Sequence, residues 1–223
     1  MALKLYYHPL SSFCQKALIA FYERQVPFEG VIIDFSDPAQ RAALEAIWPI
    51  GKFPVIRDED RGRTVPEASL VIEYLDRAHA GPPPLVPADP ETALRVRLWD
   101  RFFDNYIHLP MQKVVGDNLR PEGSRDPTGV AEAKAQIAKS WGLLDAHLAR
   151  TDGDWMIADT FTLADCAAAP AIFYANVVQP FDGLERVQDY FSRLLDRPSF
   201  ARCIEEAKPY WQYFPLEWPE SYL

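Results

Sequence analysis

The fold is decided by Gly51-Lys52-Phe53-Pro54-Val55, which Glu67-Ala68-Ser69 follows thirteen residues after Pro54. Pro54 stands between a helix-patterned segment and a short apolar run, so we expect it to open a strand, where it is not required to donate to the ladder. An X-Pro bond can turn the chain sharply at this point by being cis. Such a turn leaves the backbone N–H and C=O of Phe53 free to pair with an extended ligand.

Glu67 begins a helix that the sequence predicts over residues 67–79. A carboxylate and open N–H groups at the start of a helix can hold the amine and the carboxylate of one ligand together. Backbone pairing at Phe53 and a clamp for a zwitterion at Glu67 are what a small peptide ligand requires.

Strand and helix patterns alternate in the first part of the chain, in the order βαβαββα. A crossover connection makes the first two strands parallel, and a tight turn makes the last two antiparallel. The predicted elements are a strand at 3–7, a helix at 12–24, a strand at 28–33, a helix from Asp37 to Ile47, strands at 55–57 and 64–65, and the helix at 67–79.

The second part is predicted to be all-helical. It is separated from the first by Gly81–Pro90, which carries five prolines in ten positions and reads as a stiff linker. Thr162-Leu-Ala-Asp165 resembles a helix capping box. The sequence thus predicts domains at 1–80 and 91–223, joined by 81–90. The predicted helices of the second domain span 90–116, 126–150, 162–178, 185–195 and 198–207.

Composition excludes several classes of protein. The net charge of −9 and the pI near 5.0 argue against nucleic-acid binding. The start MALKLYYHPL is too short and polar for a signal peptide, and no apolar run reaches the roughly 18 residues of a membrane span. Cys14, Cys166 and Cys203 lack metal-ligand spacing and fit a reducing compartment. We expect a cytoplasmic protein with no metal and with neither a nucleic-acid nor a membrane partner.

Together these features resemble the glutathione transferase superfamily over the whole chain, as a cytosolic, serine-type, bacterial member with a thioredoxin-like first domain. Glu67-Ala-Ser-Leu-Val-Ile-Glu-Tyr-Leu75 is close to the family pattern E-S-x-A-I-x-x-Y-L, with alanine where serine is usual. The missing hydroxyl at Ala68 could weaken glutathione binding. The resemblance implies glutathione-binding positions at Phe53, Pro54, Glu67, Ala68 and Ser69. Lys52 either pairs with the glycyl carboxylate of glutathione or is an ordinary surface lysine.

The resemblance also places the thiol-activating residue near the start of the first helix. In serine-type classes the catalytic serine stands five residues before a basic residue, as Ser11 stands before Lys16. A hydroxyl at a helix N-terminus donates to sulfur and favours the thiolate. Ser11 is the first candidate, followed by Ser12 and Tyr7. The alternatives are that the serines only cap the helix and that Tyr7 packs in the core.

An electrophile pocket is expected between the domains, although most candidate residues also fit an ordinary core. The tail from Pro209 to Leu223 is unusually aromatic and is expected to lie across the pocket or the second domain. The candidates are Phe13, Tyr106, His108, Met111, Trp211 and Phe214.

The expected function is glutathione transfer to small hydrophobic electrophiles, as in detoxification. The alternatives are a glutathione-dependent isomerase or peroxidase on the same site and a non-catalytic binding protein of the same fold. A cysteine-type thiol reductase is disfavoured because Ser11 occupies the nucleophile position of Ser11-Ser-Phe-Cys14. The resemblance further implies a homodimer, with an interface on the apolar helix from Glu91 to Val115.

Overall fold

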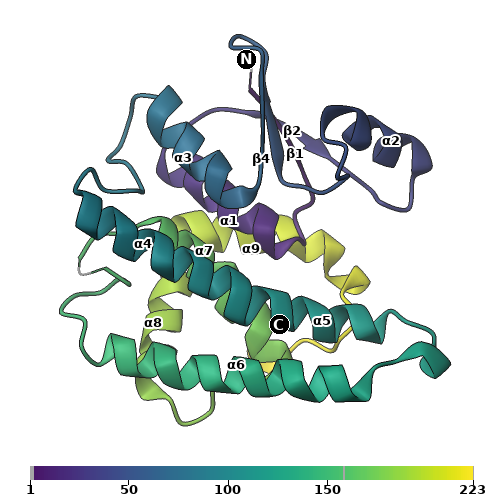
Figure 1. The fold of residues 1–223 in the computed structure, drawn as a ribbon, viewed down its shortest axis with the longest axis vertical. Coiled ribbons are helices and arrows are strands. Elements are labelled where there is room, and N and C mark those ends of the chain that lie inside the picture. Colours follow the sequence, from purple (N-terminus) through teal and green to yellow (C-terminus); the bar gives the residue numbers. More distant parts are fainter. Residues whose placement is uncertain (1–2, 158, 223) are drawn as a thin grey trace.

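The first part of the chain forms a four-stranded sheet with three helices (Figure 1). The structure is a computed structural model that describes residues 3–157 and 159–222. The strand order is β2-β1-β3-β4, with β1 and β2 parallel and the other pairs antiparallel. This confirms the predicted thioredoxin-like βαβαββα arrangement. The elements are β1 (Leu3–Tyr7), α1 (Ser12–Glu23), β2 (Glu29–Ile32), α2 (Pro38–Ile47), β3 (Val55–Asp58), β4 (Arg63–Pro66) and α3 (Ala68–Ala78).

The second part is helical, as predicted. Within the described residues, no helix is both long and apolar enough to span a bilayer. The helices are α4 (Pro90–Phe103), α5 (Leu109–Asn118), α6 (Pro127–Leu148), α7 (Leu163–Val178), α8 (Glu185–Asp196) and α9 (Pro198–Ala207), with a π-helical turn η1 (Asp104–His108) and short 3₁₀ turns η2 (Glu122–Ser124), η3 (Lys208–Tyr213) and η4 (Glu220–Tyr222).

The predicted helix over 90–116 is interrupted by the π-helical turn η1. Pro110 explains the interruption, because a proline inside a helix has no N–H for the carbonyl four residues earlier and its ring crowds that carbonyl. That carbonyl belongs to Tyr106, and it accepts a hydrogen bond from Ser140 Oγ of α6 at 3.0 Å. The same hydroxyl lies 2.9 Å from the carbonyl of Gln136 on its own helix, so Ser140 shares one proton between that carbonyl and the one that the proline leaves open.

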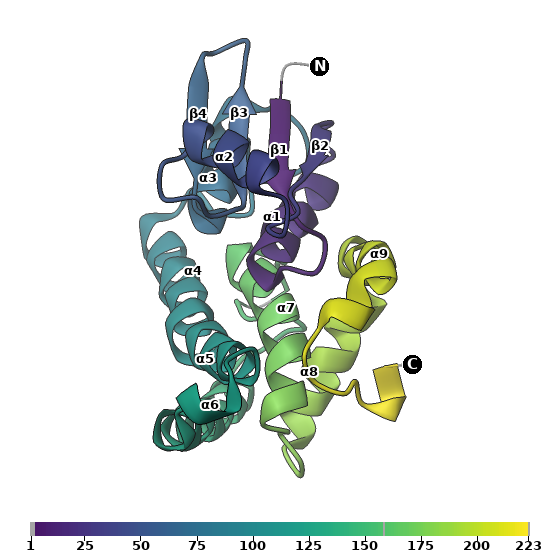
Figure 2. The same ribbon diagram turned by 90° about the vertical axis from the view of Figure 1, so that its right-hand side faces the viewer.

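Helix α7 lies at the centre of the second domain, against α1 and α4 (Figure 2). It is buried on almost every side, from Leu163 to Ala175. At its start the Asp165 carboxylate accepts from the N–H groups of Met156 and Thr162 at 2.9 and 2.8 Å, and from the Tyr190 hydroxyl at 2.7 Å. The predicted capping box is confirmed, and it anchors the preceding loop as well as the helix.

The segment between α3 and α4 is held by one carboxylate. Asp76 on α3 accepts from the N–H groups of Leu85 and Val86 at 3.1 and 2.9 Å, and pairs with Arg24 Nε at 3.1 Å. Arg24 in turn donates to the carbonyl of His79 at 2.8 Å. Residues 79–89 form no helix or strand, so these bonds fix the path of the chain between the two domains.

Candidate functional site

A cavity of about 300 Å³ opens where the two domains meet. It lies at the turn before β3 and at the starts of α1 and α3, and α5 closes it from the second domain. Its lining residues are Ser11, Phe13, Phe35, Trp48, Lys52, Phe53, Pro54, Glu67, Ala68, Leu109 and Gln112. Seven of these residues are among those predicted from the sequence, and these seven come from three separate segments.

The Phe53–Pro54 peptide bond is cis, as the sequence predicts. The ladder between β1, β3 and β4 begins only at Val55, so Phe53 lies outside it. Its ring stacks on Phe35 with the ring centroids 4.6 Å apart and an interplanar angle of 13°. Phe35 belongs to the connection between β2 and α2, and no pattern in the sequence pointed to it.

Glu67 occupies the N-cap position of α3 with a backbone φ of +71°. A non-glycine residue with positive φ is uncommon and often marks a functional site. The Glu67 side chain is exposed and makes no capping hydrogen bond. The backbone N–H groups of Ala68 and Ser69 are in the first turn of the helix, where no intrahelical acceptor exists. A carboxylate and open N–H donors thus meet at one edge of the cavity.

Ser69 does not line the cavity, because its side chain belongs to a buried ion cluster. Its hydroxyl accepts from Lys16 Nζ at 2.9 Å and donates to Asp100 at 2.9 Å. Lys16 Nζ also lies 2.5 Å from Asp100 Oδ1 and 2.8 Å from Asp104 Oδ2. Arg101 pairs with both carboxylates from the solvent side. The cluster joins α1 and α3 of the first domain to α4 of the second.

The charges of this cluster compensate one another. Burial by itself would raise the pKa of the Asp104 carboxyl, but the Lys16 ammonium and the neighbouring His108 together outweigh burial and hold that pKa well below its usual range. His108, fully buried beside Asp104 at 3.4 Å, has its pKa lowered by burial. The lysine that the sequence singled out by its spacing from Ser11 is therefore a buried interdomain ion.

Ser11 is the N-cap of α1, and its hydroxyl oxygen accepts from the N–H of Cys14 at 3.4 Å. Accepting this bond leaves the hydroxyl proton available for donation. Ser12 is buried at 5% exposure and does not line the cavity. Burial raises the pKa of the Cys14 thiol to about 12, so this thiol stays protonated at neutral pH.

Tyr7 lies at a different cavity of about 650 Å³, between the end of α1, β2 and α9. The same cavity is also lined by Tyr22, Arg202 and Glu206. The Tyr22 hydroxyl donates to Glu206 at 2.6 Å. Tyr7 and Ser11, which the sequence offered as alternative thiol-activating residues, therefore line different cavities.

Only Phe13, of the six residues predicted for the electrophile pocket, lines the cavity. Tyr106 is half exposed on η1, whereas His108 and Met111 are buried. Trp211 and Phe214 belong to the tail, where both pack on Trp218. Leu109 and Gln112 supply the second-domain wall instead. The π-helical turn changes the helix register before Leu109, so helical spacing in the sequence does not show which side chains of this segment face the cavity.

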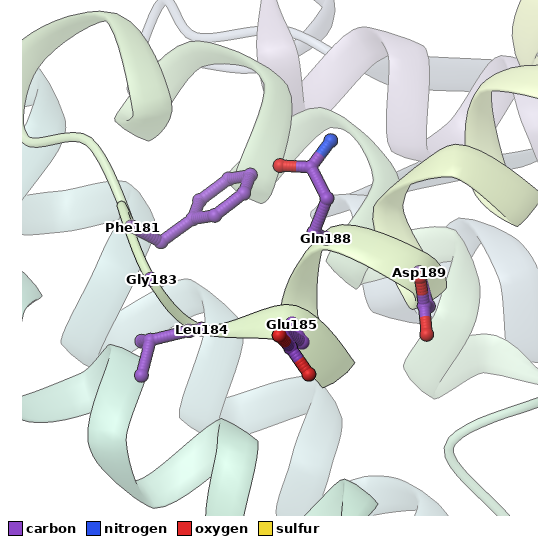
Figure 3. A pocket seen from close by; sticks show the side chains of 6 residues that line it. All are labelled: Phe181, Gly183, Leu184, Glu185, Gln188 and Asp189. Carbon is purple, nitrogen blue, oxygen red and sulfur yellow. The ribbon is translucent and has the colours of Figure 1, made fainter.

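Another hollow, of about 290 Å³, lies at the turn between α7 and α8 (Figure 3). Phe181 and Gln188 reach toward it, while the carboxylates of Glu185 and Asp189 lie at the start of α8. It contains none of the residues that the sequence predicts for the site.

The comparisons with known proteins agree with this geometry. Residues 5–83 match the family model Glutathione S-transferase, N-terminal domain, and residues 127–195 match Glutathione S-transferase, C-terminal domain. Glutathione S-transferase 3 of Zea mays is 28% identical over 211 residues, which cover 91% of this chain and 93% of that protein.

Two solved structures are similar over nearly their whole length. A glutathione S-transferase of Methylobacterium radiotolerans in complex with glutathione sulfonate is 28% identical, with a TM-score of 0.77 and coverage of 90% of this chain and 93% of that one. A glutathione S-transferase of Methylobacillus flagellatus with glutathione bound has a TM-score of 0.81 at 22% identity, covering 90% and 98% of the two chains.

The first domain is thioredoxin-like and has a cavity at its cis-proline turn, and an attached helical domain closes that cavity. These features define a class of two-domain, thioredoxin-like proteins. The two family models, which match most of each domain, make the assignment more specific. The chain belongs to the glutathione S-transferase superfamily.

The ion cluster gives a stability prediction. Lys16→Met should lower the free energy of unfolding by roughly 3–5 kcal/mol, because it leaves the buried carboxylates of Asp100 and Asp104 without their main counter-ion. Urea denaturation measures this loss. Lys134→Met, on the exposed face of α6, is the matched control and should be nearly neutral. Equal losses for the two variants would contradict a stabilising role for the cluster.

Proposed function

We propose that this protein is a glutathione transferase that binds glutathione in the cavity between Phe53, Glu67 and Ser11. The observation that carries the proposal is the convergence of these residues on one cavity from three separate segments. The complex of the Methylobacterium radiotolerans relative with glutathione sulfonate supports the choice of ligand. Fold alone would not, because one fold serves many functions.

In this proposal the tripeptide lies extended along the turn before β3. Its cysteinyl backbone pairs with the backbone of Phe53, and its γ-glutamyl amine binds the Glu67 carboxylate. The γ-glutamyl carboxylate meets the open N–H groups at the start of α3. Lys52, exposed at the cavity, faces the glycyl carboxylate. Ala68 contributes no hydroxyl, so the backbone carries the binding at that position.

Ser11 is proposed to donate its hydroxyl proton to the sulfur of bound glutathione. A hydrogen bond to the charged form favours that form and lowers the thiol pKa. The N-terminus of α1 adds a favourable dipole for negative charge. The thiolate then attacks an electrophile, without a covalent enzyme intermediate.

The electrophile is proposed to lie against Phe13 and Leu109, with Gln112 as the nearby polar group. These walls favour a small hydrophobic substrate. Isomerisation and peroxide reduction would use the same thiolate, so an electrophile screen separates them. The three free, buried cysteines fit a reducing compartment, and we place the protein in the cytoplasm.

We also propose that the protein is a homodimer. Leu94 and Leu98 on α4 are 63% and 64% exposed, and Leu70 on α3 is 53% exposed. An ion pair between Glu73 and Arg97 joins the same two helices, three residues from Leu70 on α3 and three residues from Leu94 on α4. An apolar patch beside an ion pair fits a second copy across a two-fold axis. Phe103, also expected there, is instead fully buried in the core.

Glutathione binding is tested at Glu67. Glu67→Ala should raise the dissociation constant of glutathione about tenfold, because a hydrogen bond to a charged group contributes roughly 1.5–3 kcal/mol. Isothermal titration calorimetry measures the constant. Glu59→Ala, an exposed carboxylate in the turn between β3 and β4, controls for net charge. Wild-type affinity in Glu67→Ala would refute the assignment of the γ-glutamyl site.

Thiol activation is tested at Ser11. Ser11→Ala should raise the pKa of bound glutathione and lower kcat, with little change in affinity, because the lost bond acts on the thiolate. Ultraviolet absorbance of the thiolate, titrated against pH, measures that pKa. Ser12→Ala is the comparison, since Ser12 is buried away from the cavity. If only Ser12→Ala raises the pKa of bound glutathione and lowers kcat, Ser11 is a helix cap and not the thiol donor.

The dimer is tested on its exposed leucines. Leu98→Glu should convert a particle of twice the 25.4 kDa chain mass into a monomer, because it buries a charge in the interface. Light scattering after size exclusion measures the mass. Leu143→Glu, at a 51% exposed leucine of α6, should leave the dimer intact. A wild-type mass of one chain at all concentrations would rule out this interface.

A further inference from the structure

The turn that carries Ser11, residues 8–11, is held partly by side chains. Two of its four carbonyls have local backbone donors: the carbonyl of His8 accepts from the N–H of Ser11 at 3.0 Å, and the carbonyl of Ser11 accepts from the N–H of Gln15 at 2.9 Å. The carbonyl of Pro9 accepts from Gln15 Nε2 at 2.9 Å. The carbonyl of Leu10 accepts from the Tyr174 hydroxyl at 2.8 Å.

Tyr174 lies in the second half of α7, in the other domain. Helix α7 packs against α1 (Figure 2). Gln15 Nε2 also donates to the Tyr174 hydroxyl, at 3.0 Å, so the two side chains form one unit. Both side chains are buried, Tyr174 at 2% exposure and Gln15 at 0%. Burial raises the pKa of Tyr174, which keeps the hydroxyl protonated and able to donate to Leu10.

The aromatic tail covers this unit. The rings of Phe214 and Trp218 lie 5.6 and 5.8 Å from the ring of Tyr174, centroid to centroid. Trp218 itself stacks on Phe214 at 4.4 Å. The bond to the Leu10 carbonyl is partly buried, and the two tail rings pack against the tyrosine ring that donates it. The position of the Leu10 carbonyl, one residue before Ser11, therefore depends on the Tyr174 hydroxyl.

We propose that Tyr174 and Gln15 are positioning residues that set the place of the Ser11 hydroxyl in the glutathione cavity. This inference rests on the proposed use of Ser11 as the donor to the thiol. Neither side chain lines the cavity, so they act through the turn. The effect is expected to be large for its distance, because a shift of about 1 Å in a reacting group can cost orders of magnitude in rate. The helical domain thus takes part in thiol activation.

The experiment compares Tyr174→Phe with Tyr190→Phe. Both changes remove one hydroxyl from a buried tyrosine of the second domain, but Tyr190 donates to Asp165, outside the Ser11 turn. Tyr174→Phe should raise the pKa of bound glutathione by roughly half to one pH unit and lower kcat by about three- to tenfold, with affinity within about twofold. Tyr190→Phe should leave that pKa unchanged, whatever it does to the melting temperature.

Amide hydrogen exchange of the ligand-free protein supplies a second measurement, which does not depend on glutathione. Tyr174→Phe should speed exchange in residues 10–12 relative to wild type and to Tyr190→Phe. Unchanged exchange there, together with an unchanged thiol pKa, would overturn the inference. A different result would separate the inference from the proposed function. If the wild-type protein does not lower the thiol pKa of bound glutathione, but Tyr174→Phe still speeds exchange in residues 10–12, then Tyr174 anchors the turn and Ser11 is not the donor.

Discussion

Helix α1 is buried between the two domains. The polar side chains that it buries there need ion-pair and hydrogen-bond partners, and the rest of the structure depends on this requirement. From Ser12 to Phe21 nearly every side chain is buried, including Gln15 and Lys16. A buried ammonium is costly unless it is paired, so Lys16 requires the carboxylates of Asp100 from α4 and Asp104 from η1. Gln15 likewise requires acceptors from the neighbouring turn. Both residues also bond to the helical domain, Lys16 through these carboxylates and Gln15 through the Tyr174 hydroxyl.

The docking has a direct consequence for the cavity. The Lys16 cluster takes in Ser69, the second residue of α3, and thereby holds the start of that helix against α4. Glu67 and the open N–H groups lie at this helix start. At the start of α1, the Tyr174 hydroxyl of α7 donates to the turn that carries Ser11. The two ends of the proposed glutathione site are therefore fixed by the same buried helix through different partners.

The second domain adds the wall that the first domain lacks, and a proline decides its register. Pro110 prevents a regular helix through Tyr106, and the resulting π-helical turn sets the direction of Leu109 and Gln112 toward the cavity. Ser140 satisfies the carbonyl that the proline leaves open. A local irregularity of the backbone thus shapes the proposed electrophile side of the site, which fits the frequent presence of π-helical turns at functional sites.

The resemblance to the glutathione transferase superfamily placed Ser11 at the site. The sequence by itself determined the order of strands and helices, the cis turn at Pro54, the cap at Thr162 and the cavity positions of Phe53 and Glu67. These follow from local chemistry: periodicity, proline geometry and capping act within a few residues. Only the tertiary structure decided that Ser69 and Lys16 share a buried cluster, that Tyr7 faces another cavity, and that Phe35 and Leu109 line the site. Each of these depends on contacts between segments far apart in the chain, and no local pattern records which side chain will face which neighbour once α1 is buried.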